Sequence, residues 1–248
     1  MEQDAFREQI ERILSLARRE AITLRLLGAN AIRLRSQTAK SMAANRRLTD
    51  LDFVGYKKER GKIERLLEHL EYQPSRTFNM VHGDERLLFL GHEGQLKVDV
   101  WLEVFRMAHT LNFKHRLPLD EPTLPLSDLL MTKLQIVELN EKDARDMVCL
   151  LADHDLSDND SDRERINISR LADVCTENWG IYKTFTINLG KIKELAPNYV
   201  SDQNSSQIIS GKIEKILSAI EKTPKSLAWK LRARVGEKRP WYETPDVR

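Results

Sequence analysis

Apolar residues in the first half of the chain recur at two spacings, one typical of helices and one typical of strands. Phe6, Ile10 and Ile13 recur at helical spacing, which predicts an amphipathic helix. The stretch before Gly28 is apolar and rich in leucine, which predicts a strand that ends at that glycine. The predicted order is helix, strand, helix, strand and helix, over residues of about 3–20, 22–28, 29–36, 50–56 and 63–70.

Three further strands are predicted between the last of these helices and the middle of the chain. They cover residues 77–83, 86–91 and 95–104. Glycines separate them at Gly83-Asp84 and Gly91–Gly94, and both stretches have the composition of hairpin turns. This half of the chain therefore predicts a small mixed sheet.

The second half of the chain has helical spacing almost throughout. Ser127 and Asn140 each precede an apolar run and are candidate N-caps. The predicted helical stretches are residues 126–139, 141–154, 168–195 and 207–222.

The change of pattern lies near residue 122, where two prolines, Pro122 and Pro125, interrupt the chain. The fold class we expect is α/β. An α/β core with a small mixed β-sheet and flanking helices would cover residues 1–122. A mainly α-helical region with a basic tail would cover residues 123–248.

The composition limits which partners the protein can bind and in which cellular compartment it is expected. The 248 residues are 41% apolar and 31% charged, and 40 basic against 38 acidic side chains give a net charge of +2. Such a balance argues against binding of nucleic acid or membrane by the whole surface. Two cysteines make no disulfide framework, and no run approaches the roughly 20 apolar residues of a membrane helix. We therefore expect a cytoplasmic protein without a membrane partner.

Aspartates interrupt two of the predicted strands. Asp50 and Asp52 alternate with Leu51 and Phe53, so both carboxylates lie on one face of their strand. Asp99 lies within another apolar strand. If the two strands are neighbours, three carboxylates converge, and such a cluster would repel itself without a cation. Carboxylates that act with substrate phosphates are the usual ligands of Mg²⁺.

A simpler interpretation competes with the metal site. A half-exposed strand whose polar residues happen to be aspartates would have the same pattern. Gly28 favours the site, because a glycine between a strand and a helix can expose backbone N–H groups to a phosphate. A single glycine there most often marks only a turn, so both interpretations stay open on the residues alone.

The order of these features resembles the nucleotidyltransferase superfamily: a glycine turn, a strand with Asp-x-Asp, and a later strand with a third aspartate. Residues 128–151 add a resemblance to the AbiEii-type family, in which a lysine like Lys133 precedes an Arg-Asp pair like Arg145-Asp146. The similarity extends over most of residues 20–190.

This resemblance implies an enzyme that moves a nucleoside monophosphate from an NTP to an acceptor hydroxyl. Asp50, Asp52 and Asp99 would be the catalytic residues and would hold two Mg²⁺ ions, with Mn²⁺ as an alternative ion. Ala29 departs from the family, which usually has glycine or serine there, and it lacks a hydroxyl for a phosphate. The resemblance implies that the Gly28-Ala29 turn and Lys133 bind the nucleotide. We add Asn30, which could supply a polar contact in place of the missing hydroxyl, and Arg47, which lies just before the aspartate strand and is either a phosphate ligand or a surface charge.

The acceptor is open, since relatives of this type modify tRNA ends, small molecules or proteins. The resemblance also includes toxins of toxin–antitoxin systems, so an antitoxin protein is a possible partner. The rival interpretation is a non-catalytic module on the same scaffold that binds nucleotides or a protein.

Two charged segments allow alternatives. Residues 153–164 place ligand-type side chains at calcium-loop positions, but Asp158 occupies the position that needs glycine, which favours a solvated loop. The tail from Lys222 has eight Lys or Arg against three Asp or Glu, interleaved with aromatics. Such a tail suits either single-stranded nucleic acid or a frayed terminus.

Overall fold

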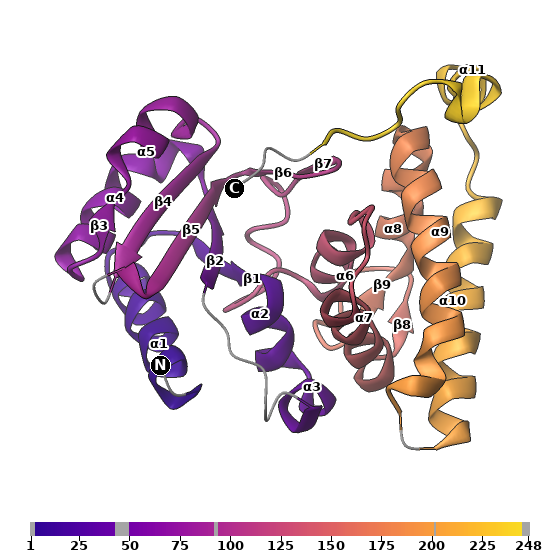
Figure 1. The fold of residues 1–248 in the computed structure, drawn as a ribbon, viewed down its shortest axis with the longest axis horizontal. Helices are drawn as coiled ribbons and strands as arrows, with labels where there is room; N and C mark the ends of the chain where they lie inside the picture. Colours follow the sequence, from indigo (N-terminus) through magenta and orange to yellow (C-terminus); the bar gives the residue numbers. More distant parts are fainter. Residues whose placement is uncertain (1–2, 43–49, 92–93, 201, 245–248) are drawn as a thin grey trace. The chain divides into compact units, whose positions relative to one another are not determined.

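The computed structural model describes residues 3–42, 50–91, 94–200 and 202–244, which form two compact units (Figure 1). Unit 1 consists of the described parts of residues 1–34, 43–105 and 111–124, and unit 2 of the described parts of residues 35–42, 106–110 and 125–248.

The α/β class is confirmed, with a five-stranded sheet in unit 1 and mainly helices in unit 2. Along the described chain, we find no helix with the length and apolarity needed to cross a membrane.

Unit 1 contains most of the elements that the first half of the sequence predicts. Its order begins with α1 (Gln3–Arg19), β1 (Leu24–Leu27), α2 (Gly28–Arg35) and β2 (Asp50–Gly55). It continues with η2 (Lys57–Glu59), α4 (Arg60–His69), β3 (Gln73–Pro74), α5 (Arg76–His82), β4 (Arg86–Gly91) and β5 (Leu96–Leu102). A hairpin of β6 (Val104–Arg106) and β7 (Thr110–Asn112) follows. η2, β3 and the β6–β7 hairpin were not predicted.

The strand order of the sheet is β1-β2-β5-β4-β3. The β2–β5 pair is parallel, and the β1–β2, β4–β5 and β3–β4 pairs are antiparallel. The two strands that carry aspartates are therefore central neighbours. The predicted hairpin between β4 and β5 is confirmed, since Gly91 pairs with Leu96.

Helix α4 covers one face of β2, and the aspartates lie on the other face. Leu51 and Phe53 are fully buried on one face. Gly55 lies on that same face, and a Cβ placed on it would lie 2.9 Å from Cδ1 of Ile63 in α4. The first face is therefore the one covered by α4, and the aspartates lie on the other.

The predicted strand over residues 77–83 is wrong, because this segment forms α5. Phe78 and Met80 alternate as in a strand, but seven residues are too few to distinguish the two periods. Met80 is 81% exposed, so the alternation does not reflect a buried face. Gly83-Asp84 accordingly joins a helix to a strand instead of forming a hairpin.

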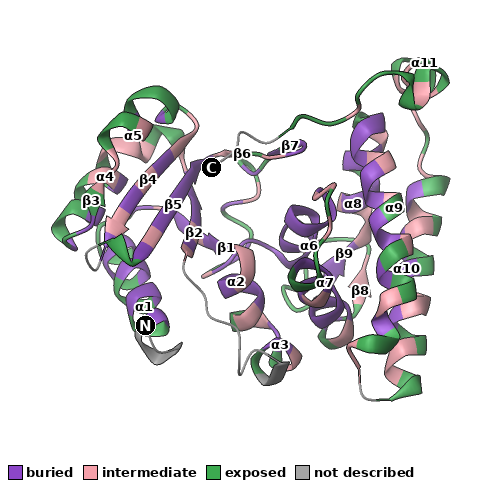
Figure 2. Cartoon of the chain, in the orientation of Figure 1, coloured by how far each residue is buried: buried purple, intermediate pink, exposed green. Residues whose placement is uncertain are grey.

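Unit 2 is a group of helices with short strands. It contains α3 (Gln37–Met42), α6 (Leu126–Leu134), α7 (Glu141–Asp153), β8 (Leu156–Ser157), β9 (Ile166–Asn167) and α8 (Ile168–Glu177). The chain continues through α9 (Trp179–Leu195), η4 (Ala196–Asn198), α10 (Gln203–Lys222), α11 (Leu227–Val235) and η5 (Gly236–Lys238). Buried residues are frequent in α6 and α7, whereas α11 is largely exposed (Figure 2).

The helix caps confirm one prediction and correct two. Asn140 caps α7, because its side chain accepts hydrogen bonds from the next turn. Ser127 lies inside α6 and is buried, so the cap assigned to it is wrong. The helical stretch 168–195 is two helices, because Asn178 ends α8 and its Oδ1 accepts hydrogen bonds from the N–H groups of Gly180 and Ile181 in α9.

Candidate functional site

Asp52 and Asp99 lie side by side on neighbouring parallel strands. In the β2–β5 register Asp52 pairs with Asp99, and Asp50 pairs with Lys97. Register partners, like alternate residues of one strand, point to the same face of a sheet, and adjacent strands lie about 4.8 Å apart. The three aspartates therefore share the face opposite α4. The expectation that their strands are neighbours is confirmed.

A buried ion pair holds the third carboxylate. Asp99 is 1% exposed, and its Oδ1 accepts a hydrogen bond of 2.7 Å from Nε of Arg86. Arg86 pairs with Trp101 in the β4–β5 register, so it lies on the same face as Asp99. Its guanidinium carbon lies 4.4 Å from the centroid of the Trp101 ring and 5.4 Å from that of the Phe78 ring. The charge of the buried carboxylate is thus compensated within unit 1, as burial of a charge requires.

Sequence reasoning missed Arg86. The signal available was an arginine that opens an otherwise apolar strand, the "RLLFLG" of residues 86–91. A cation at that position needs an anion nearby, but only the β4–β5 register identifies the anion as Asp99.

Gly28 lies against the carboxylate of Asp52. It follows β1 and is the first residue of α2, with a φ of +71°, a conformation that L side chains rarely adopt. A Cβ placed on Gly28 would lie 2.5 Å from Oδ2 of Asp52. Glycine is needed here for its backbone conformation and for the room it leaves. The predicted glycine turn and the predicted carboxylates are therefore in one place.

The two residues after Gly28 belong to the first turn of α2. The positive φ lies at Gly28 and not at Ala29, so the departure from the family's usual residue brings no backbone strain. Asn30 is buried, and its Nδ2 donates a 2.9 Å hydrogen bond to the backbone carbonyl of Asp50. Asn30 therefore ties the start of α2 to the aspartate strand. A phosphate contact by Ala29 or Asn30 stays a prediction.

The donor set suits a hard cation. Asp50 and Asp52 are half-buried, and Asp99 is shared with Arg86. Across the described ranges, no three His, Cys, Asp or Glu side chains are gathered closely enough to hold a metal by themselves. Mg²⁺ usually takes only one or two protein carboxylates and completes its shell with water and substrate phosphates. The adjacent carboxylates of Asp52 and Asp99 meet that requirement. Arg47, predicted to bind the nucleotide, lies outside the described residues.

Lys133 is the centre of a buried ion cluster in unit 2. Its Nζ lies 2.8 Å from Oδ1 of Asp143 and 2.9 Å from Oδ2 of Asp146. Burial lowers the pKa of Lys133, but the charges of Asp146 and Asp143 outweigh it, and the net pKa is raised. The Lys and Arg-Asp segments that carry the family resemblance are therefore joined through Asp146. The phosphate contact expected of Lys133 stays a prediction.

The acidic run of residues 153–164 is a segment that begins at the C-terminus of α7 and is held there by its first aspartate. Asp153 is the last residue of α7 and accepts hydrogen bonds from Oγ of Ser36, at 2.5 Å, and from the backbone N–H of Thr38, at 2.8 Å. The Asp153 carboxylate therefore binds the segment that connects α2 to α3. Asp153 would be the first ligand of a calcium loop, so this contact argues against the calcium-loop alternative.

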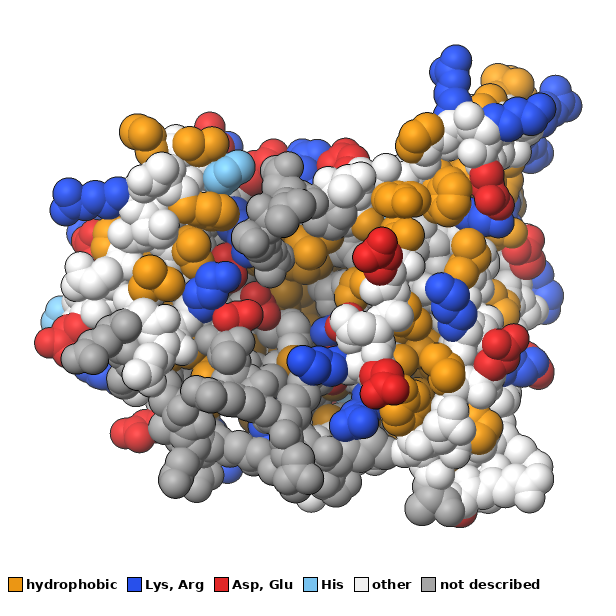
Figure 3. All heavy atoms as spheres, in the orientation of Figure 1, with side chains coloured by type: hydrophobic (Ala, Val, Ile, Leu, Met, Phe, Trp, Pro, Cys, Tyr) orange, Lys and Arg blue, Asp and Glu red, His pale blue; other side chains and the backbone are white. Residues whose placement is uncertain are grey.

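The described part of the basic tail packs against the helices of unit 2. Nε1 of Trp229 donates to the carbonyl of Cys175, and Nε1 of Trp241 donates to Oγ1 of Thr184. The alternative of a frayed terminus is thus wrong for the described part of the tail. These two rings pack within unit 2, whereas basic side chains gather on the outside of α11 (Figure 3). A binding partner of this tail would therefore contact its basic side chains and not these two aromatic rings.

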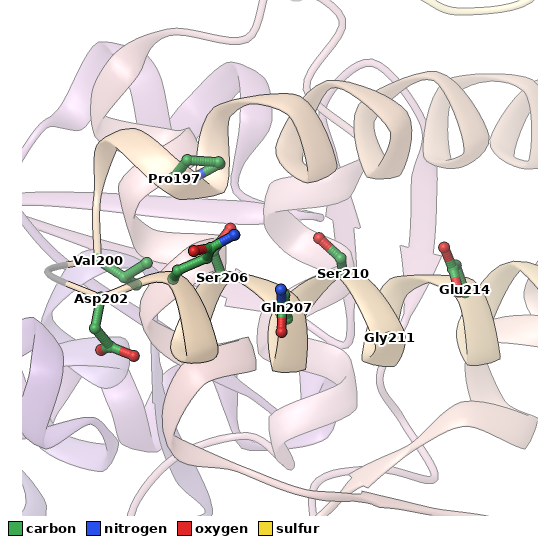
Figure 4. A pocket seen from close by; sticks show the side chains of 9 residues that line it. Pro197, Val200, Asp202, Ser206, Gln207, Ser210, Gly211 and Glu214 are labelled. Carbon is green, nitrogen blue, oxygen red and sulfur yellow. The ribbon is translucent and has the colours of Figure 1, made fainter.

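A groove in unit 2 runs along α10. Its walls are the segment of Pro197 and Val200 and the polar face of α10, including Ser206, Ser210 and Glu214 (Figure 4). It has neither the paired carboxylates of the β2–β5 face nor a cation among its lining residues. We therefore place the candidate site in unit 1.

Comparisons with known proteins found one distant structural similarity and no match in sequence. No family model matches the chain, and no curated protein matches it. Among solved structures, the solution structure of the antibiotic-resistance factor ANT(2'')-Ia is similar, with 11% sequence identity and a TM-score of 0.38. The alignment covers 88% of this chain and 97% of that chain.

Proposed function

We propose that the chain is a metal-dependent nucleotidyltransferase whose site is the aspartate face of β2 and β5 together with the Gly28 turn. The observation that carries this proposal is the position of Asp52. It pairs with Asp99 across the parallel strands, and its Oδ2 lies against Gly28 at the start of α2. Two carboxylates and a helix N-terminus therefore adjoin.

A triphosphate suits the start of α2. The first turn of this helix has no acidic side chain, and unpaired backbone N–H groups at a helix N-terminus attract phosphate oxygens. The carboxylate of Asp52 next to that turn would repel the same phosphates. A divalent cation between them removes this conflict, which is the physical reason to expect one.

Asp50, Asp52 and Asp99 are the residues that would hold the cation. When bound, a divalent cation would offset the charge of the phosphates and stabilise the attacking and leaving oxygens. The chain's own groups supply position: α2 binds the β- and γ-phosphates, and the rigid strands fix the carboxylates.

The transfer follows from this arrangement. The acceptor oxygen forms a bond to the α-phosphorus, and the bond from that phosphorus to the bridging oxygen of the β-phosphate breaks. Pyrophosphate leaves with the electron pair of that bond, next to the N–H groups of α2. The proton of the acceptor hydroxyl passes to Asp99.

RNA is the acceptor class to test first. α11 has no acidic residue, and Lys230 and Arg234 are exposed on it, whereas Arg232 donates to carbonyls of the tail. Exposed cations of this kind attract phosphate backbones. A toxin role with an antitoxin partner belongs to this proposal through the family resemblance. Growth arrest on expression, relieved by a neighbouring gene product, would test it.

Labelled NTPs provide the direct test. The chain is incubated with each α-labelled NTP, Mg²⁺ or Mn²⁺, and either total RNA or total protein. We expect label in one fraction and a loss of about 100-fold or more in Asp52→Asn and Asp99→Asn, as when one contact that stabilises a transition state is removed. Asp84→Asn is the matched control, because the Asp84 side chain is 83% exposed. Full activity in Asp52→Asn would refute the proposal.

The rival is a binding module on the same scaffold. Titration calorimetry with NTPs, with and without Mg²⁺, separates the two functions. Binding that depends on the metal, followed by turnover, supports the enzyme. Metal-independent binding without any transfer supports the module.

A further inference from the structure

We infer that Arg86 is a positioning residue for Asp99: it fixes the orientation of the carboxylate and so determines which oxygen faces the cation and the acceptor. This inference rests on the proposed function. It goes beyond it by assigning a role to a residue that lies outside the aspartate pattern.

The contact between the two residues is directional. Nε of Arg86 donates to Oδ1 of Asp99 at 2.7 Å. A carboxylate has two oxygens, so a bond on Oδ1 leaves Oδ2 as the oxygen for a cation or a hydroxyl. Rotation of the carboxylate would break a charge-assisted hydrogen bond inside the fold, where Asp99 is 1% exposed. The carboxylate is therefore held before any ligand arrives.

Arg86 is itself held by its neighbours. Its guanidinium carbon lies over the rings of Trp101 and Phe78, at 4.4 and 5.4 Å from their centroids. Oδ1 of Asn79, the residue after Phe78, accepts a hydrogen bond from the backbone N–H of Leu88 at 2.8 Å, which attaches α5 to β4. A planar guanidinium that stacks on rings has one preferred orientation, and a lysine ammonium does not.

A purely structural ion pair predicts a different result. In that case the loss of Arg86 would lower the stability of unit 1, because it leaves a buried carboxylate without its partner. The folded fraction would still bind metal and turn over normally. If Arg86 positions Asp99, metal affinity and turnover fall even in protein that is fully folded.

The test compares Arg86→Met and Arg86→Lys with wild type, using Mn²⁺ alone as the probe. Mn²⁺ affinity is measured by electron paramagnetic resonance, kcat and KM for the NTP by label transfer, and the folded fraction by circular dichroism. Removal of the hydrogen-bond partner of a metal ligand typically costs 10–100-fold in affinity or activity. We expect a loss of about that size in Mn²⁺ affinity and kcat of Arg86→Met, an unchanged KM, and intermediate values for Arg86→Lys. Arg7→Met is the matched control, since its ion pair with Glu11 is exposed on α1.

Unchanged Mn²⁺ affinity and kcat in folded Arg86→Met would overturn the inference. If that variant does not fold, Arg86→Lys is the deciding variant, because it keeps the positive charge and lacks the planar guanidinium that stacks on the two rings. Wild-type Mn²⁺ affinity and kcat in Arg86→Lys would also overturn the inference. Wild-type protein that neither binds Mn²⁺ nor transfers label would refute the proposed function instead.

Discussion

Oδ2 of Asp52 lies 2.5 Å from the point that a Cβ on Gly28 would occupy. Residues 24 positions apart in the chain are thus in van der Waals contact at the end of β1, where Leu27 pairs with Asp52. The contact joins the helix start that could bind phosphate to the carboxylate that could bind a cation. Neither feature has a specific function alone, because each is common in proteins.

Gly28→Ala tests this contact. The substitution places a methyl group on the Asp52 carboxylate and forces alanine to a φ of +71°. The backbone conformation costs about 1–2 kcal/mol, and the carboxylate must move. We expect loss of label transfer and of Mn²⁺ binding.

Gly94→Ala is the control for Gly28→Ala. Gly94 has a φ of +86°, and among the described residues no atom lies within 4 Å of its Cβ position. Both variants carry the cost of a positive φ in thermal unfolding, and Gly28→Ala adds the clash with Asp52. Only Gly28→Ala should lose activity when both are assayed at a temperature where they are folded. Equal activity in the two variants would contradict the importance of the contact.

Lys133→Met tests the ion cluster of unit 2. It leaves Asp143 and Asp146 buried without their common cation. Breaking a buried pair in this way typically costs about 3–5 kcal/mol, and we expect a loss of that order in urea unfolding. Lys142→Met is the control, because Lys142 is exposed on α7. A variant with wild-type stability and weakened NTP binding would favour the phosphate role instead.

His109 should make stability depend on pH. It is 5% exposed, its Nε2 lies 2.8 Å from Oγ1 of Thr184, and burial lowers its pKa to about 4. The unfolded chain, with a pKa near 6.5, then binds the proton more tightly than the folded one. The stabilising contribution is complete above pH 6.5 and is lost as the pH falls towards 4, by about 3 kcal/mol in total.

Urea unfolding at pH 7.0, 5.5 and 4.5 measures this dependence. His109→Gln should flatten the curve between pH 6.5 and 4, whereas His115→Gln should not, because His115 is exposed. A curve for His109→Gln parallel to that of wild type would show that another group is responsible.

Asn178→Ala tests the break between α8 and α9. Oδ1 of Asn178 accepts hydrogen bonds from the backbone N–H groups of Gly180, at 2.7 Å, and Ile181, at 3.2 Å. Loss of such a cap typically costs about 1 kcal/mol. Asn204→Ala, at an exposed position of α10, should leave the unfolding midpoint in place. No difference between the two variants would contradict the assigned cap.

Local sequence patterns predicted the elements in which the periodic spacing continues over many residues or in which clear signals mark the ends. The amphipathic spacing from Phe6 predicted α1, and the alternation around Asp50 predicted β2. Predictions from short segments failed: the strand predicted over residues 77–83 is replaced by α5 (Arg76–His82), in which Met80 is exposed. α6 ends at Leu134, earlier than its spacing predicts, because Asn188 from α9 donates hydrogen bonds to the carbonyls of Leu134 and Ile136. No local pattern contains such a tertiary contact.

The sequence by itself determined that Asp50 and Asp52 share a strand face and that Gly28 ends a strand before a helix, because side-chain alternation and turn chemistry are local. Only the tertiary structure decided that Asp52 pairs with Asp99, that Gly28 lies against Asp52, and that Arg86 holds Asp99. Strand order and register depend on how the whole sheet buries its apolar face. The neighbours of each carboxylate are therefore a property of the fold, while the carboxylates themselves are a property of the sequence.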